Sequence, residues 1–177
     1  MKQICAALGV LLLASPVWAA DDSAMKVAAE GFYATYAAIP HDGVPDDAAV
    51  AKLRPHLAPG LVLLIEQASA AQDRFEQMTK NREPPLIEGD IYTSLFEGAS
   101  SYSIGACSGD ANNGRCAVSL VYSNPPAAPV TWTDTLYLTN TSQGWKVSDV
   151  GYGGTWPFGN KGKLSQTLQM AIIDAGD

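Results

Sequence analysis

The pattern of apolar and polar positions changes from a helical period to a strand period near the middle of the chain. Over residues 22–39, apolar side chains recur at spacings of three and four, which predicts an amphipathic helix. Asp46 or Asp47 caps a predicted short helix that ends near Leu53, and the longest predicted helix covers about residues 60–80. The first half of the chain is therefore predicted to be helical.

The second half has the period of two that is typical of half-buried strands. Strands are predicted over residues 101–107, 115–123, 130–139 and 144–151, and a terminal helix is predicted from about Lys163. Turn-forming residues between these runs indicate consecutive antiparallel hairpins. Residues 86–98 are apolar but have two glycines and no sustained period, which predicts an irregular crossing segment. Helices followed by about four antiparallel strands predict an α+β fold with a short C-terminal helix.

The N-terminus has the pattern of a secretory signal peptide. Lys2 precedes a short apolar run, and small residues suited to cleavage follow it. Cleavage is predicted after Ala19, with Ala20 as the alternative. The apolar run is shorter than the roughly 20 residues that a membrane-spanning helix needs. We therefore expect residues 1–19 to be removed and residues 20–177 to form one exported domain without a membrane anchor.

The composition excludes several classes of partner. The formal net charge is −7, and it becomes about −8 when Lys2 leaves with the signal peptide. An acidic surface argues against nucleic acids and anionic membranes as partners. The two histidines, His41 and His56, stand apart without a zinc-binding pattern, and no phosphate-binding or nucleophile motif occurs. We expect no metal and no cofactor.

Two cysteines remain after removal of the signal peptide, and they are predicted to form a disulfide. Cys107 and Cys116 flank a segment rich in Gly, Asn and Asp, which is typical of a hairpin loop. In an oxidising compartment such a pair is expected to be bonded. Closing so short a loop stabilises a fold by roughly 2–3 kcal/mol.

Two predicted strands each place one carboxylate on an otherwise apolar face. Asp134 shares its face with Trp132, and Asp149 shares its face with Trp145 and Val147. Because side chains alternate along a strand, these two faces are predicted to be neighbours. A carboxylate on a core-side face must be paired, hydrogen-bonded or protonated, because desolvating an isolated charge is costly.

These carboxylates support two interpretations. In the functional one, they line the mouth of a pocket, contact a ligand, or act as an acid and a base. The candidate pocket or ligand-binding residues are Asp90, Trp132, Asp134, Trp145, Asp149, Tyr152 and Trp156. In the structural one, each Asp accepts hydrogen bonds from backbone N–H groups or from Tyr and Trp, and closes the sheet onto residues 86–98. No residue is assigned as catalytic.

A set of short motifs spans most of the mature chain. They are FYATY at 32–36, EGD at 88–90 followed by TSLFEG at 93–98, WTD at 132–134, and GWKVSDVGY at 144–152. Together they resemble DUF3828, a family of small secreted bacterial domains of unknown function. The resemblance implies an NTF2/cystatin-like fold, in which helices pack in the curve of an antiparallel sheet. It transfers no catalytic residue, and similar folds host unrelated functions.

Three functions fit these observations. The leading expectation is a non-catalytic periplasmic binding or accessory protein, whose partner is a periplasmic protein or a small ligand. The first alternative is an immunity-type inhibitor of a cell-wall-degrading toxin. The second is a small pocket enzyme that uses Asp134 and Asp149 for acid/base chemistry. The enzyme predicts an apolar cavity with both carboxylates pointing inward, whereas a filled interior favours the other two.

Overall fold

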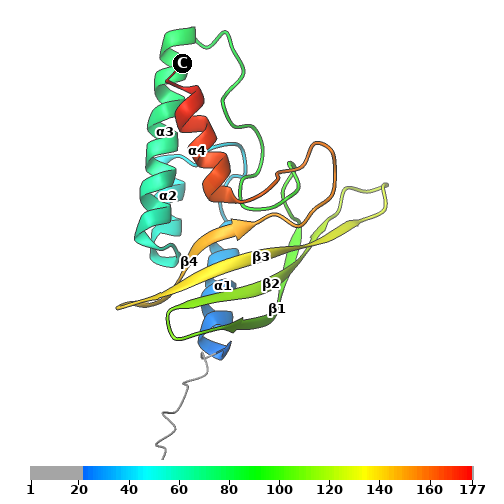
Figure 1. Cartoon of the computed structure of the whole chain (residues 1–177). Coiled ribbons are helices and arrows are strands. Elements are labelled where there is room, and N and C mark those ends of the chain that lie inside the picture. The colour runs from blue at the N-terminus through cyan, green and yellow to red at the C-terminus, as the bar shows by residue number, and fades with distance from the viewer. Residues whose placement is uncertain (1–21, 177) are drawn as a thin grey trace, which may run out of the picture.

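The computed structural model describes residues 22–176, which form helices and one antiparallel sheet (Figure 1). The helices are α1 (Asp22–Tyr36), α2 (Asp47–Leu53), the 3-10 helix η1 (Arg54–His56), α3 (Pro59–Thr79) and α4 (Leu164–Asp174). The strands are β1 (Ser101–Gly109), β2 (Asn113–Tyr122), β3 (Val130–Thr141) and β4 (Gly144–Gly151). The α+β fold predicted from the sequence is confirmed. The predicted signal peptide and its cleavage site lie outside the described residues.

The four strands pair in chain order, and α1 packs on one face of the sheet (Figure 1). Alternate residues of β2 and β3 point into this face and are fully buried, among them Val118, Leu120 and Leu136. The aromatic rings of Phe32 and Tyr33 on α1 fill the space that the sheet encloses. The interior between helix and sheet is therefore packed with side chains.

A second helical layer lies beyond the edge of the sheet. In Figure 1, α3 and α4 run side by side and extend away from β4. The Ala58 N–H donates to Val147 O at 2.7 Å, which ties the start of α3 to β4. Among the described residues, no helix is both long and apolar enough to cross a membrane.

Element boundaries differ from the prediction by a few residues. The first helix ends at Tyr36 rather than at Ile39, because the next turn is closed by hydrogen bonds between residues three apart, such as Ile39 N–H to Tyr36 O, and not four apart as in an α-helix. Strands β1 and β2 run further toward each other than predicted, because Asp110 tightens their connection. Its Oδ1 accepts hydrogen bonds from the N–H groups of Asn112 and Asn113 at 2.8 and 2.9 Å.

The predicted disulfide is present between two paired strands. Cys107 on β1 and Cys116 on β2 are bonded and face each other in the register of the sheet. The bond closes the hairpin near its loop, as expected from the sequence. It fixes the edge strand β1 to the buried strand β2.

The prediction that Asp149 shares the buried face with Val147 is wrong. The register of β3 and β4 shifts by one residue: Leu138 pairs with Val147, but Tyr137 pairs with Asp149. This β-bulge reverses the alternation in the second half of β4. Val150 therefore takes the buried position beside Leu136, and Asp149 moves to the opposite face, where it is half-buried.

Candidate functional site

The carboxylate of Asp134 is completely buried and accepts four hydrogen bonds. Its Oδ2 accepts from Ser94 N–H at 2.8 Å and from the Trp132 indole N–H at 3.0 Å. Its Oδ1 accepts from Gly153 N–H at 2.8 Å and from the Ser94 hydroxyl. A buried carboxylate needs such partners. Asp134 thus joins β3, the irregular segment and the chain after β4, which matches the structural interpretation of this residue.

Asp149 binds the first turn of α4 instead of lining a pocket with Asp134. Its Oδ2 accepts from the Ser165 hydroxyl at 2.7 Å, and its Oδ1 accepts from Ser165 N–H at 3.0 Å. The first N–H groups of a helix have no partner within the helix, and the helix dipole favours an anion there. Asp149 therefore caps α4 from β4, and Asp134 and Asp149, the pair of the acid/base alternative, occupy different faces of the sheet.

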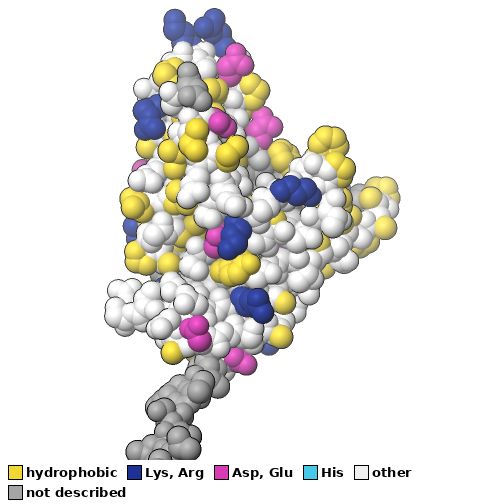
Figure 2. All heavy atoms as spheres, viewed as in Figure 1, with side chains coloured by type: hydrophobic (Ala, Val, Ile, Leu, Met, Phe, Trp, Pro, Cys, Tyr) yellow, Lys and Arg dark blue, Asp and Glu magenta, His cyan; other side chains and the backbone are white. Residues whose placement is uncertain are grey.

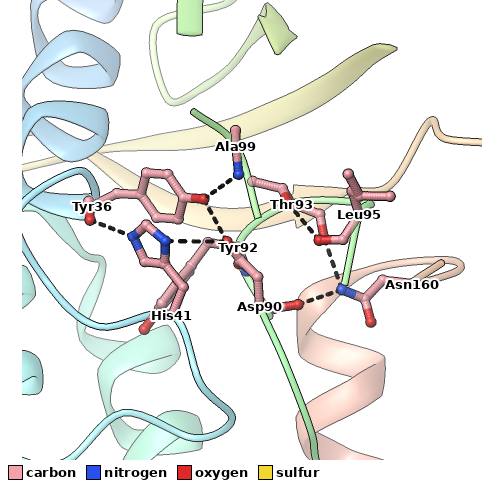
Figure 3. Close-up of polar contacts among 8 residues, drawn as sticks. All are labelled: Tyr36, His41, Asp90, Tyr92, Thr93, Leu95, Ala99 and Asn160. Atoms are coloured by element: carbon pink, nitrogen blue, oxygen red, sulfur yellow. Dashed lines mark hydrogen bonds and ion pairs between the residues drawn. The ribbon is translucent and has the colours of Figure 1, made fainter. Parts of the chain in front are cut away.

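Asp90 lies at the centre of a third polar cluster (Figure 3). The Tyr36 hydroxyl donates to Asp90 Oδ2 at 2.5 Å and accepts from Ala99 N–H at 2.9 Å. The ring of His41 stacks on that of Tyr36 with centroids 4.0 Å apart, and its Nδ1 lies 4.0 Å from Asp90 Oδ2. The carboxylate side chain has no solvent exposure. Substrate cannot reach Asp90 directly in this arrangement.

Burial governs the protonation of this cluster. It raises the pKa of Asp90 to about 6, against the opposing effects of the Tyr36 hydrogen bond, backbone N–H groups and His41. Burial and the charge of Asp90 also raise the pKa of the Tyr36 phenol. Gly98 seals the cluster, because a Cβ there would lie 2.7 Å from Asp90 Oδ2. The cluster can therefore hold or share a proton but is closed to a ligand.

The Asp90 and Asp134 clusters both involve the predicted irregular segment, residues 86–98, and the loop after β4. The Asn160 amide donates to the carbonyls of Asp90 and Thr93 at 2.6 and 2.7 Å, as Figure 3 shows. The Tyr152 hydroxyl donates to Ile91 O at 2.6 Å. These contacts lock a buried, irregular stretch of chain against the sheet. They provide hydrogen-bond partners for backbone carbonyl groups of residues 86–98, which would otherwise be paired in a helix or a strand.

The three tryptophans of the candidate set do not form one binding face. Trp132 and Trp156 meet edge to face with centroids 5.3 Å apart. Trp145 pairs with Asn140 at the opposite end of β3, eight residues from Trp132. At the rise per residue of a β-strand, Trp145 and Trp132 are therefore roughly 25 Å apart along β3. Only Trp132 and Trp156 thus adjoin the Asp134 cluster.

An open apolar hollow lies on the surface beside Trp156. It has a volume of about 530 Å³ and is lined by Leu95, Phe96, Glu97, Trp156, Phe158 and Gly159. Phe158 is 93% exposed and Phe96 is 44% exposed. In Figure 2, hydrophobic side chains lie at the outer end of the loop after β4. We call this feature the aromatic hollow.

Several of these residues could not be recognised in the sequence. Ser94 and Asp134 are 40 positions apart, and Tyr36 and Asp90 are 54 apart, so no local pattern links them. Phe96 and Phe158 are exposed because of the path that their loops take, and nothing in the neighbouring sequence distinguishes them from buried phenylalanines. The EGD and TSLFEG motifs did mark the segment that carries Asp90 and Ser94.

The fold and these contacts define an α+β domain whose buried carboxylates hold segments together and whose open surface carries an aromatic hollow. Comparisons with protein-family models, with curated proteins and with solved structures gave no match for this chain. The resemblance to DUF3828 therefore stays a prediction.

Proposed function

We propose that the chain is an exported, non-catalytic binding or accessory protein of the bacterial periplasm, and that it belongs with the DUF3828 domains it resembles. The signal-peptide pattern of residues 1–19 and the Cys107–Cys116 disulfide support export. The hydrogen bonds that occupy Asp134 and Asp149 support a structural use of both carboxylates. This leaves the surface as the functional part.

The observation that carries the proposal is the exposure of Phe158. A phenylalanine that is 93% exposed beside a hollow lined by Trp156 and Phe96 gains nothing for folding. Aromatic side chains of this kind anchor ligands and protein partners, because their burial on binding removes a large apolar area from water. The aromatic hollow is therefore the binding site in this proposal.

Photo-crosslinking tests this site. Phe158 is replaced by the photoreactive analogue benzoylphenylalanine, and the same analogue replaces Ile173 as a control, because Ile173 is 61% exposed on α4. We expect irradiation of intact cells to give one discrete adduct from position 158 and none from position 173, with mass spectrometry distinguishing a protein from a small ligand. Excess wild-type protein should compete for the adduct, whereas Phe158→Ser protein should not. No adduct at 158, or the same adduct from both positions, would contradict the proposal.

Charge favours an immunity-type inhibitor as the second candidate. The net charge of −7 suits a cationic partner, and the loop that carries Phe158 projects beside the sheet (Figure 1). Such a loop is suited to entering the active site of a basic cell-wall-degrading enzyme. Inhibition of such an enzyme by the wild-type protein, with loss of inhibition in Phe158→Ser, would select this function. Full enzyme activity at micromolar protein would remove it.

A further inference from the structure

A second hollow lies between α1, η1 and the β3–β4 hairpin. It has a volume of about 570 Å³. Small and apolar residues of α1, including Val27 and Gly31, form one side of it, and Trp145 forms another. Val27 is 65% exposed although it is apolar. This hollow shares no lining residue with the aromatic hollow.

The side of this hollow formed by η1 carries His56, and the hydrogen bonds of Thr35 determine which nitrogen of its ring is protonated. The Thr35 hydroxyl donates its one hydrogen to Gly31 O at 3.1 Å, so its oxygen can only accept from His56 Nε2 at 2.9 Å. His56 Nε2 must therefore carry a proton. Among the described residues, His56 Nδ1 has no hydrogen-bond partner, so the neutral ring has a lone pair left for an external donor.

Two features keep His56 Nδ1 unprotonated and place it near the positive charge of Lys146. Burial and the nearby Lys146 ammonium hold the pKa of His56 below its usual value, which favours the neutral ring. Lys146 also lines the hollow, and its Nζ donates to Pro55 O at 2.5 Å. No Asp or Glu is among the described residues that line the hollow. An anionic group beside Lys146 would therefore meet no opposing carboxylate on these walls.

We propose that this hollow binds a small aromatic acid that carries a hydroxyl group. Its ring packs against Trp145 and the small residues of α1, its hydroxyl donates to His56 Nδ1, and its carboxylate lies near the Lys146 ammonium. The three groups line one hollow, so a single small molecule can contact all of them. The site is independent of the aromatic hollow and of the function proposed for it.

Para-hydroxybenzoate is the probe, and benzoate is its match without the hydroxyl donor. Binding is followed by the NMR signal of the Trp145 indole N–H. We expect para-hydroxybenzoate to shift this signal with a dissociation constant of about 1 mM, and benzoate to bind roughly fivefold to tenfold more weakly because it cannot donate to His56. The indole signals of Trp132 and Trp156 should stay in place.

A glycine substitution tests the role of His56 without removing it. A Cβ at Gly31 would lie 3.1 Å from His56 Nδ1 and Cε1, so Gly31→Ala should displace the ring. A Cβ at Gly60, in the first turn of α3, would have no neighbour within 4 Å, which makes Gly60→Ala the matched control. Alanine favours a helix more than glycine does, so both variants should fold.

We expect Gly31→Ala to bind para-hydroxybenzoate as weakly as benzoate, and Gly60→Ala to bind it like the wild type. Lys146→Met should weaken both probes, whereas Lys161→Met, on the loop after β4, should change neither. The proposal is overturned if the Trp145 signal does not move at about tenfold the expected dissociation constant, where a site of that affinity is nearly full. Equal affinity for the two probes in the wild type, or wild-type binding by Gly31→Ala, would overturn it as well.

Discussion

Replacing Asp90 by Asn should change how the stability of the fold depends on pH. The pKa of Asp90 is raised from 3.8 to about 6, mainly because the carboxylate is buried. The folded protein therefore binds the Asp90 proton more tightly than the unfolded chain does. The resulting stabilisation is complete below pH 3.8 and is lost as the pH rises through about 6. Above that pH, the fold contains a buried charge that the variant lacks.

The size of the effect follows from the shift. A change of about two pKa units corresponds to about 3 kcal/mol, at 1.36 kcal/mol per unit. The Asn side chain loses an acceptor for one of the two donors, the Tyr36 hydroxyl and Tyr92 N–H, which adds a destabilisation that does not vary with pH. Part of the stabilisation by the bound proton is already lost at pH 4, where the unfolded carboxyl is about half ionised, so we expect the free energy of unfolding of the variant, minus that of the wild type, to rise by about 2.4 kcal/mol between pH 4 and pH 7.

Urea unfolding at a series of pH values measures this difference. Contributions common to both proteins cancel in this difference. Because His41 Nδ1 lies 4.0 Å from Asp90 Oδ2, the comparison is repeated with His41→Gln in both proteins. The positive charge of His41 lowers the pKa of Asp90, and its removal should make the rise with pH larger. A difference that is flat between pH 4 and pH 7 would refute the assignment of a buried, titrating Asp90.

Two further comparisons test the buried polar groups by urea unfolding at neutral pH. Tyr33→Phe should leave the free energy of unfolding unchanged or raise it by about 1 kcal/mol, because the buried Tyr33 hydroxyl has no hydrogen-bond partner among the described residues. Tyr36→Phe should lower it by about 1–3 kcal/mol, because it removes the hydrogen bond to Asp90. A large loss of stability in Tyr33→Phe would mean that the Tyr33 hydroxyl is paired. Asp134→Asn should lower the free energy of unfolding by roughly 2–4 kcal/mol, because the amide N–H₂ group would face hydrogen-bond donors in place of a carboxylate oxygen. Asp149→Asn should lower it by about 1 kcal/mol, because it weakens the cap of α4. Unchanged stability in Asp134→Asn would instead favour a ligand-contacting role for that residue.

The parts of the fold that the sequence predicted are those set by local periodicity. The stripe on α1 and the alternation along β3 are consequences of helix and strand geometry, so the elements and the burial of Asp134 could be predicted from spacing. The face of Asp149 could not, because it depends on a β-bulge at Ser148. That bulge turns Asp149 toward Ser165 at the start of α4, a contact that no local pattern encodes.

The candidate site was predicted in part for the same reason. Asp134 was recognised as a carboxylate on an otherwise apolar strand face, which is a property of its own neighbours in the sequence, and Asp90 was named as a candidate pocket residue within the EGD motif. Their partners, Tyr36 and Ser94, come from distant segments and were missed. The aromatic hollow depends on the path of two loops, and Phe158 carries no local signal that separates it from a core residue.

The way in which residues 90–98 are held has a consequence for how this domain can change length. Groups of α1 and β3 bind Asp90 and Ser94 in that stretch, and the chain after β4 binds several of its positions, so adding a residue would shift every later group out of reach of its partner. Residues 81–85 and 124–129 are exposed throughout and have no such contacts with distant segments among the described residues. Insertions, fused tags and natural length variation should be accepted in those two loops and rejected between Asp90 and Gly98.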